Sequence, residues 1–178
     1  MPLTLTGREI WAVIHGMMLG SLFLLAYGGG LAELINLSSK WSTEAGIKKR
    51  VRRLIVGTWF MAVVAWLTVI IGTWIVYPMY RAKPPAGADL SMFPRSFLLS
   101  KPELAQWHKF GMEWKEHVAW LAPILATTVA YMVTRYGARL AKDDQVRRAV
   151  IVLFSIAFFA AAVAGLFGAF INKAAPIH

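Results

Sequence analysis

The sequence contains no cysteine, and this absence removes several kinds of chemistry. Without thiols there are no disulfides, no cysteine nucleophile and no thiolate ligands for zinc or an iron–sulfur cluster. A metal or cofactor must therefore be held by histidine, methionine, carboxylate or backbone groups. Histidine is also scarce, because the chain has four: His15, His108, His117 and His178.

Charged residues are few as well. They make up 16% of the 178 residues, whereas 58% are hydrophobic and the mean hydropathy is +0.55. A soluble domain carries about 25% charged residues. The sequence also lacks a phosphate-binding loop, a nucleophile elbow and paired core carboxylates. The composition therefore argues against a water-soluble enzyme.

The apolar residues fall into four blocks that contain no Asp, Glu, Lys or Arg. These blocks are residues 10–32, 54–80, 117–134 and 149–172. Each approaches or exceeds the roughly 20 residues that a helix needs to cross the hydrocarbon. We therefore predict an all-α integral membrane four-helix bundle that forms a single domain over residues 1–178. The first block is too long for a signal peptide, so we expect it to remain in the mature fold.

The basic residues predict the orientation of the bundle. Eleven of the nineteen lie in the two short connections: Lys40, Lys48, Lys49, Arg50, Arg52, Arg53, Arg135, Arg139, Lys142, Arg147 and Arg148. Connections rich in Lys and Arg stay in the cytoplasm, so both termini and the loop 81–116 are expected outside. The net charge of +10 then reflects topology and contact with anionic lipid rather than nucleic acid. We expect a protein of a bacterial inner (plasma) membrane.

The outer loop 81–116 is expected to contain an amphipathic surface helix that leads into the third span. Pro84 and Pro85 exclude a helix at the start of the loop, and Ser100 with Glu103 resembles a capping box. Apolar residues then recur at spacings of three and four: Leu104, Trp107, Gly111, Trp114 and Val118. Such a helix either caps the bundle, or docks a partner or covers a cofactor.

The two halves of the sequence also resemble each other. Val51-Arg52-Arg53 precedes the second block much as Val146-Arg147-Arg148 precedes the fourth, and Gly72 with Ile75 corresponds to Gly168 with Ile171. This weak repeat predicts two hairpins related by a pseudo-twofold axis along the membrane normal. It also predicts that His15 and His117 lie at similar depth.

His15 and His117 are the main candidates for a site. His15 lies inside the first span, and a polar ring in the membrane usually marks function. His117 begins the third block on the same outer side, so the two imidazoles can approach a common point inside the bundle. Two neutral imidazoles at matched depth are suited to the axial ligation of one haem b near the outer face.

Other residues are expected to support this haem. Gly16 and Gly20 would let a planar ring approach the backbone, Arg81 would pair with a propionate, and Glu113 would hold the second ring nitrogen of His117. His108 lies nine residues before His117 and is an alternative ligand only if the chain bends. The inner half has no histidine, so we expect at most one haem and no conduction across the whole membrane by this chain alone.

Four spans with His15 in the first and His117 at the head of the third resemble the small four-helix membrane b-type cytochromes. This class includes cytochrome b561-like proteins and the haem-bearing anchor subunits of membrane oxidoreductases. The resemblance covers the architecture and no extended motif, and the di-haem members have more membrane histidines than this chain. It implies quinol or cytochrome partners at the outer face. We therefore expect an electron-transfer subunit of a larger respiratory or photosynthetic complex.

Three alternatives stay open. The chain is a non-catalytic accessory subunit whose histidines only form hydrogen bonds, or it holds copper or zinc with His15, His117 and either His108 or Glu113. A single histidine that ligates chlorophyll is the third. A transporter is disfavoured because there is no inverted repeat and no ionisable carboxylate or amine in the predicted mid-membrane blocks.

Overall fold

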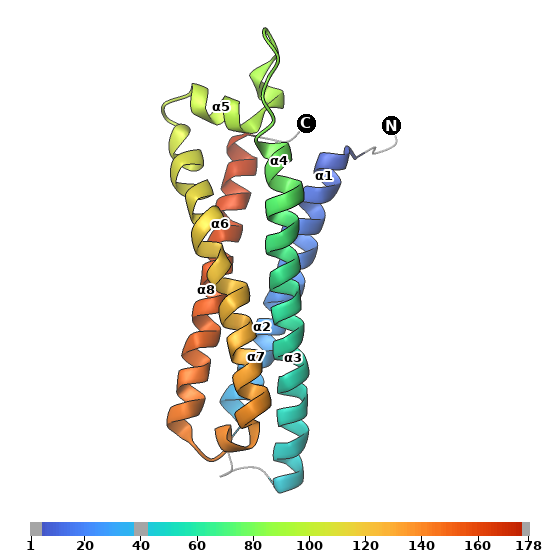
Figure 1. Cartoon of the computed structure of the whole chain (residues 1–178), viewed down its shortest axis with the longest axis vertical. Coiled ribbons are helices and arrows are strands. Elements are labelled where there is room, and N and C mark those ends of the chain that lie inside the picture. Colours follow the sequence, from blue (N-terminus) through green and yellow to red (C-terminus); the bar gives the residue numbers. More distant parts are fainter. Residues whose placement is uncertain (1–4, 38–42, 176–178) are drawn as a thin grey trace. The chain divides into compact units, whose positions relative to one another are not determined.

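The computed structural model describes residues 5–37 and 43–175, so Lys40 and His178 lie outside the described residues. Within these ranges the regular elements are helices and none is a strand (Figure 1). Four helices are long and apolar enough to cross a membrane: Gly7–Asn36, Glu44–Tyr80, Trp107–Leu140 and Asp144–Ala174. The predicted all-α class and the four candidate membrane spans are confirmed.

Several spans contain short segments of π-helix or 3-10 helix between α-helical parts. The first consists of α1 (Gly7–Ala12), η1 (Val13–Met18) and α2 (Leu19–Asn36), and the second of α3 (Glu44–Ile71), η2 (Gly72–Val76) and α4 (Tyr77–Tyr80). The third consists of η4 (Trp107–Met112), α6 (Glu113–His117), η5 (Val118–Trp120) and α7 (Leu121–Leu140), and the fourth is α8 (Asp144–Ala174). Of these segments, η1, η2 and η4 are π-helical and η5 is a 3-10 helix.

Local hydrogen bonds explain why the helices extend beyond the apolar blocks. Thr6 and Glu9 form a capping box at the start of α1, where the Glu9 amide donates to Thr6 Oγ1 and the Thr6 amide donates to Glu9 Oε2. At the start of α8, the Val146 amide donates to Asp143 Oδ1 over 3.1 Å. An apolar block marks the part of a helix that suits hydrocarbon, whereas the caps decide where helical hydrogen bonding begins.

The structure corrects the prediction for the connection between the second and third spans. Helix α5 (Pro94–Ser100) ends where the surface helix was expected to begin, and Ser100 Oγ donates to the Phe97 carbonyl instead of capping a helix. The amphipathic segment is the first part of the third span, which begins at Trp107 rather than at residue 117. Charged residues ended the apolar block at 117, but they do not interrupt helical hydrogen bonds.

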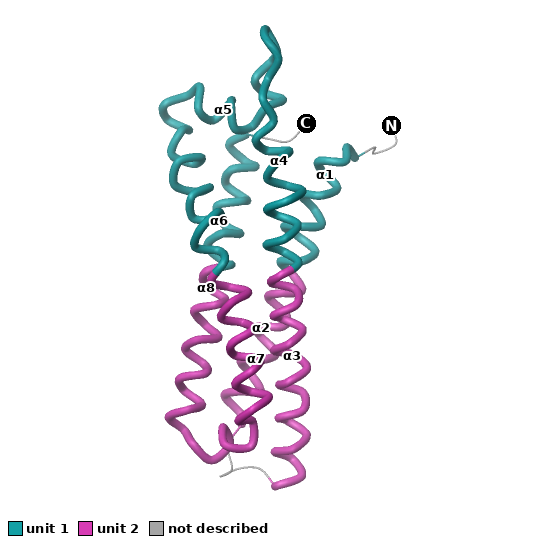
Figure 2. The backbone as a smooth tube through the Cα atoms, viewed as in Figure 1, with its two compact units in different colours: residues 1–20, 67–120, 161–178 teal, residues 21–66, 121–160 magenta. Residues whose placement is uncertain are grey.

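The chain divides into two compact units, which are coloured separately in Figure 2. Unit 1 comprises Met1–Gly20, Leu67–Trp120 and Ala161–His178, and unit 2 comprises Ser21–Trp66 and Leu121–Ala160. Each unit therefore contains a stretch of all four spans. Unit 1 also includes η3 (Leu90–Met92) and α5.

Aromatic residues of α2 and α8 pack closely in unit 2. Phe154 is fully buried, and a Cβ added at Gly30 would lie 2.8 Å from its ring. The Tyr27 ring stacks on Phe158 with centroids 4.0 Å apart, and the Tyr27 hydroxyl lies 3.0 Å from Ser155 Oγ. Glycine at position 30 therefore permits the contact between these two helices, and the tyrosine keeps a polar partner.

Two pairs of polar side chains join α3 to α7 in unit 2. The indole N–H of Trp59 donates to Thr134 Oγ1, and that of Trp66 donates to Thr127 Oγ1, each over 3.0 Å. Both threonine hydroxyls in turn donate to backbone carbonyls one turn earlier. Each pair is seven residues from the other on both helices, so the two bonds repeat on one face of each helix.

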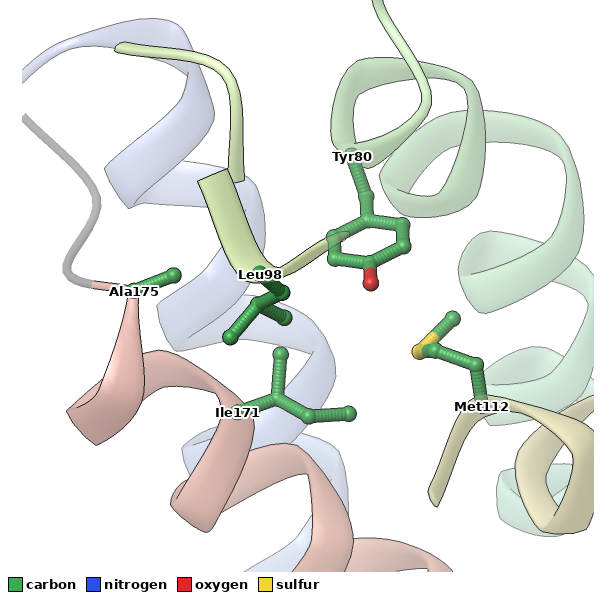
Figure 3. Packing of buried hydrophobic residues seen from close by; sticks show 5 residues of the cluster. All are labelled: Tyr80, Leu98, Met112, Ile171 and Ala175. Carbon is green, nitrogen blue, oxygen red and sulfur yellow. The ribbon is translucent and has the colours of Figure 1, made fainter. Parts of the chain in front are cut away.

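The buried core of unit 1 lies around Tyr80. Its members are Tyr80, Leu98, Met112, Ile171 and Ala175, which are gathered in Figure 3. The first four come from α4, α5, η4 and the C-terminal part of α8, and Ala175 directly follows α8. The cluster anchors the connection between the second and third spans to α8, so this connection is a packed part of unit 1.

Candidate functional site around His15

The His15 imidazole packs directly on the backbone of the second span. His15 lies in η1 and Gly72 begins η2. A Cβ added at Gly72 would lie 2.7 Å from His15 Cε1, which is closer than side-chain atoms normally approach. The ring therefore needs glycine at position 72. Both residues belong to π-helical segments, which are rare and are often found at functional sites.

The two ring nitrogens of His15 have different surroundings. The imidazole forms a hydrogen bond with the backbone of Thr68, one turn before Gly72. Nδ1 is buried and has no hydrogen-bond partner. In a neutral imidazole one nitrogen donates and the other accepts. With Nε2–H donating to the Thr68 carbonyl, Nδ1 carries a free lone pair inside unit 1.

Lys115 is the second polar group at this place. It lies in α6, its side chain is partly buried, and its amino group lies within electrostatic range of His15. A Cβ added at Gly168 would lie 3.0 Å from Lys115 Nζ, so the lysine reaches across to α8. No carboxylate among the described residues forms an ion pair with it. We call His15, Thr68, Gly72, Lys115 and Gly168 the His15–Lys115 site.

A buried polar group without a partner is costly, and more so where lipid replaces water. The His15–Lys115 site contains one unpaired acceptor, Nδ1, and one amino group without a carboxylate. Phe110 and Trp114 pack on Phe167, which belongs to the same stretch of α8 as Gly168, so the neighbourhood is apolar. The arrangement is suited to a ligand that offers both a hydrogen-bond donor and an electron-rich oxygen on an apolar body.

The structure does not bring His117 to His15. The His117 side chain is 70% exposed, and its Nδ1 lies 3.0 Å from the Glu113 carbonyl and 3.3 Å from Glu113 Oε2. The expected contact with Glu113 is thus present. His117 follows Lys115 by two residues, which on a helix turns a side chain by about 200°. Because Lys115 reaches toward Gly168 on α8, His117 points away from α8.

The internal repeat explains which residue takes the place expected for His117. Gly72 and Gly168 occupy corresponding positions in the two halves of the sequence, and each lies against a polar side chain. Gly72 contacts His15, whereas Gly168 contacts Lys115. The repeat therefore identified Gly72 and Gly168. The side chain that lies against Gly168, however, is Lys115 and not His117, which follows it by two residues.

His108, the alternative ligand, contacts the buried core of unit 1 instead of His15 or His117. Its ring is partly buried, and Nδ1 lies 2.9 Å from the hydroxyl of Tyr80 in the unit 1 core. Arg81 lies over the ring of Tyr77 at 5.2 Å, and the Tyr77 hydroxyl donates to Glu116 Oε1 over 2.5 Å. These contacts occupy His108 and Arg81 within unit 1. Gly16 and Gly20 have no neighbouring atom within 4 Å of an added Cβ, so no close approach depends on them.

The described residues give no support to a copper or zinc site. No group of three His, Asp or Glu side chains comes close enough to hold a metal ion within residues 5–37 and 43–175. His15, His108 and His117 have separate partners, as described above. A tetrahedral site needs three or four converging ligands.

No family model, no curated protein and no solved structure matches this chain. The function of the chain is therefore inferred from its own residues. Lys115 is the residue that the sequence analysis missed, because three nearby charges, Glu113, Lys115 and Glu116, placed it in the outer loop. A signal was present: a lysine two residues from a candidate ligand, in a segment with helical apolar spacing.

Proposed function

We propose that this chain is a membrane-embedded subunit of an electron-transfer complex and that the His15–Lys115 site binds a quinol. The observation that supports it most is the unpaired, buried Nδ1 of His15 beside Lys115. A quinol hydroxyl donates a hydrogen bond to Nδ1, and a quinol oxygen accepts one from Lys115. The apolar ring and tail of a quinol also suit the apolar neighbourhood formed by Phe110, Trp114 and Phe167.

The electrons of a bound quinol must pass to another redox centre, because neither imidazole nor amine accepts them. We therefore place that centre in a partner subunit, in agreement with the expected larger complex. In this proposal the chain binds and orients the quinol, and His15 accepts at Nδ1 the proton of the hydroxyl that is hydrogen-bonded to it. The second quinol proton passes to solvent, and both electrons pass to the centre in the partner subunit. By the distribution of basic residues, the site is in the half of the chain predicted to face outward.

Haem b is the second candidate ligand, and the same Nδ1 atom favours it. An imidazole nitrogen with a free lone pair could ligate haem iron, and a bound haem would supply one-electron transfer. His15 would hold the iron through Nδ1, whereas His117 in its exposed position would not provide a second nitrogen ligand. A haem held by this chain alone would thus have a single histidine ligand.

Binding of a short-chain benzoquinone and its quinol to the purified protein in detergent tests the first candidate. Tryptophan fluorescence or calorimetry measures the affinity. We expect His15→Ala and Lys115→Met each to weaken binding about tenfold or more, because each removes one polar contact to the ligand. His117→Ala is the matched control and should leave the affinity unchanged, since this exposed ring pairs only with Glu113.

A reduced-minus-oxidised spectrum separates the two candidates. Absorption bands of a b-type haem that disappear in His15→Ala and persist in His117→Ala would identify haem, rather than quinol, as the ligand of the site. A folded wild-type protein that shows no such bands and binds no quinol would overturn both, and would favour the accessory subunit. Equal loss of quinol binding in His117→Ala and His15→Ala would contradict the His15–Lys115 site.

A further inference from the structure

An open groove lies in unit 2 between the beginning of α3 and the end of α7, far along the sequence from the His15–Lys115 site. Its volume is about 290 Å³, and its walls are almost entirely apolar. The apolar lining includes Ile47, Val51, Ile55 and Ala138, and the two charged residues in the lining are Lys48 and Arg52. We propose that this groove binds one anionic phospholipid.

The shape of the groove follows from small residues on α7. Val51 packs against Gly137, where an added Cβ would clash with the valine side chain. The helices therefore come close at this point, while the neighbouring Ala138 is exposed and leaves a hollow. Ile47, Val51 and Ile55 are spaced by four and so form a stripe of about 12 Å along α3. A stripe of this kind accommodates an acyl chain lying along the helix.

The volume supports a single chain of lipid rather than a larger ligand. Pockets for drug-sized molecules range from about 300 to 1,000 Å³ and bury most of the ligand. At about 290 Å³ this groove lies just below that range, and it is open. An acyl chain suits it, because the remainder of the lipid stays in the bilayer.

The charges around the groove are unbalanced, and this imbalance selects an anionic headgroup. Every carboxylate described in unit 2 already has a basic partner: Glu33 with Arg50 and Arg53, Glu44 with Lys48, Asp143 with Arg139, and Asp144 with Arg147. Arg52 is exposed and has no ion pair among the described residues. Lys48 pairs only with Glu44, and both side chains are exposed, so this pair is weak.

Further basic residues lie at the same end of α7. Arg135 is one turn before Ala138 on α7, Lys142 lies in the turn that follows α7, and both are exposed. Neither forms an ion pair with a described carboxylate. A lipid phosphate near Lys48 and Arg52 would therefore meet additional positive charge from α7. This half of the chain is the one predicted to face the cytoplasm, where the leaflet carries anionic lipid.

Native mass spectrometry of the protein released from phosphatidylglycerol and phosphatidylcholine nanodiscs tests the proposal. We expect the wild type to retain one phosphatidylglycerol in preference to phosphatidylcholine. The variant K48Q/R52Q should reduce its retention about tenfold or more, because two charges near the phosphate are removed. The control K49Q/R148Q removes two exposed charges that do not line the groove and should retain the lipid.

The variant Ala138→Leu fills the groove without a change of charge. Because residue 138 is exposed, leucine should leave the fold intact and still exclude the acyl chain. Loss of the retained lipid in this variant supports the groove, and unchanged retention overturns it. If K49Q/R148Q lost as much phosphatidylglycerol as K48Q/R52Q, the attraction would be diffuse and electrostatic. This result would also overturn the proposal of a lipid site in the groove. Displacement of the lipid by millimolar inorganic phosphate would identify a free-anion site instead. Quinol binding is measured separately, so the two proposals fail independently.

Discussion

The contact between His15 and Gly72 allows a sharp test by mutation. In Gly72→Ala the new methyl carbon would lie 2.7 Å from His15 Cε1, 3.3 Å from Nε2 and 3.5 Å from Nδ1. Ordinary van der Waals contact begins at 3.4 Å, so the ring must retreat by about 0.7 Å, the difference of the two distances. This movement also disturbs the hydrogen bond to Thr68.

The expected cost follows from two opposing effects. Overpacking of a close contact costs about 1–3 kcal/mol, and alanine gains up to about 1 kcal/mol over glycine in a helix. We therefore expect Gly72→Ala to lower the free energy of unfolding by about 1–2 kcal/mol. In a His15→Ala background the clash is gone, and the same substitution should be neutral or stabilising by up to about 1 kcal/mol.

The four proteins to compare are the wild type, Gly72→Ala, His15→Ala and the double variant. Titration of each purified protein in detergent with sodium dodecyl sulfate measures its free energy of unfolding. Gly20→Ala is the matched control within a spanning helix, because no atom lies within 4 Å of its added Cβ. It should be neutral or slightly stabilising in both backgrounds. The reasoning is refuted if Gly72→Ala destabilises the protein equally with and without the His15 ring.

Two further predictions concern the helix contacts and caps. Thr134→Val leaves the Trp59 N–H without its partner and should destabilise the protein by about 1 kcal/mol in detergent unfolding. Thr128→Val, which loses only a bond within its own helix, should have a smaller effect, and equal effects would contradict the role of the pair. The Val146 amide that donates to Asp143 lowers the pKa of this carboxyl below 3.8. A carboxyl group whose pKa is lower in the folded than in the unfolded protein stabilises the fold at pH values above its unfolded pKa. This stabilisation is lost as the pH falls through the folded pKa. Asp143→Ala should therefore lower the Tm at about pH 7 and have little effect at about pH 2, whereas a constant difference in Tm would argue against the cap.

The sequence predicted the four spans because their signal is local. A mainly apolar run without charged residues, such as 149–172, suits hydrocarbon whatever it packs against. The bounds were less accurate, since caps such as Asp143 extend a helix past its apolar block. The connection was partly wrong: the expected helix that leads into the third span is present from Trp107, but Ser100 does not cap it.

The sequence also identified His15 and, through the repeat, the two glycines Gly72 and Gly168. It did not reveal that His117 is exposed while Lys115 reaches Gly168. Two residues apart on a helix, these side chains point in nearly opposite directions. Which of them faces inward depends on how the helix is rotated, and apolar spacing interrupted by charges does not define that rotation.

Composition and apolar runs alone determined that this protein is helical and suited to a membrane, because transfer to lipid depends on each residue's own surface. Tertiary structure decided which polar groups meet. The pairing of His15 with Gly72, of Lys115 with Gly168 and of His108 with Tyr80 joins residues distant in the chain. Such pairings depend on the rotation and local winding of each helix, including the π-helical turns, and these are fixed only when the helices pack together.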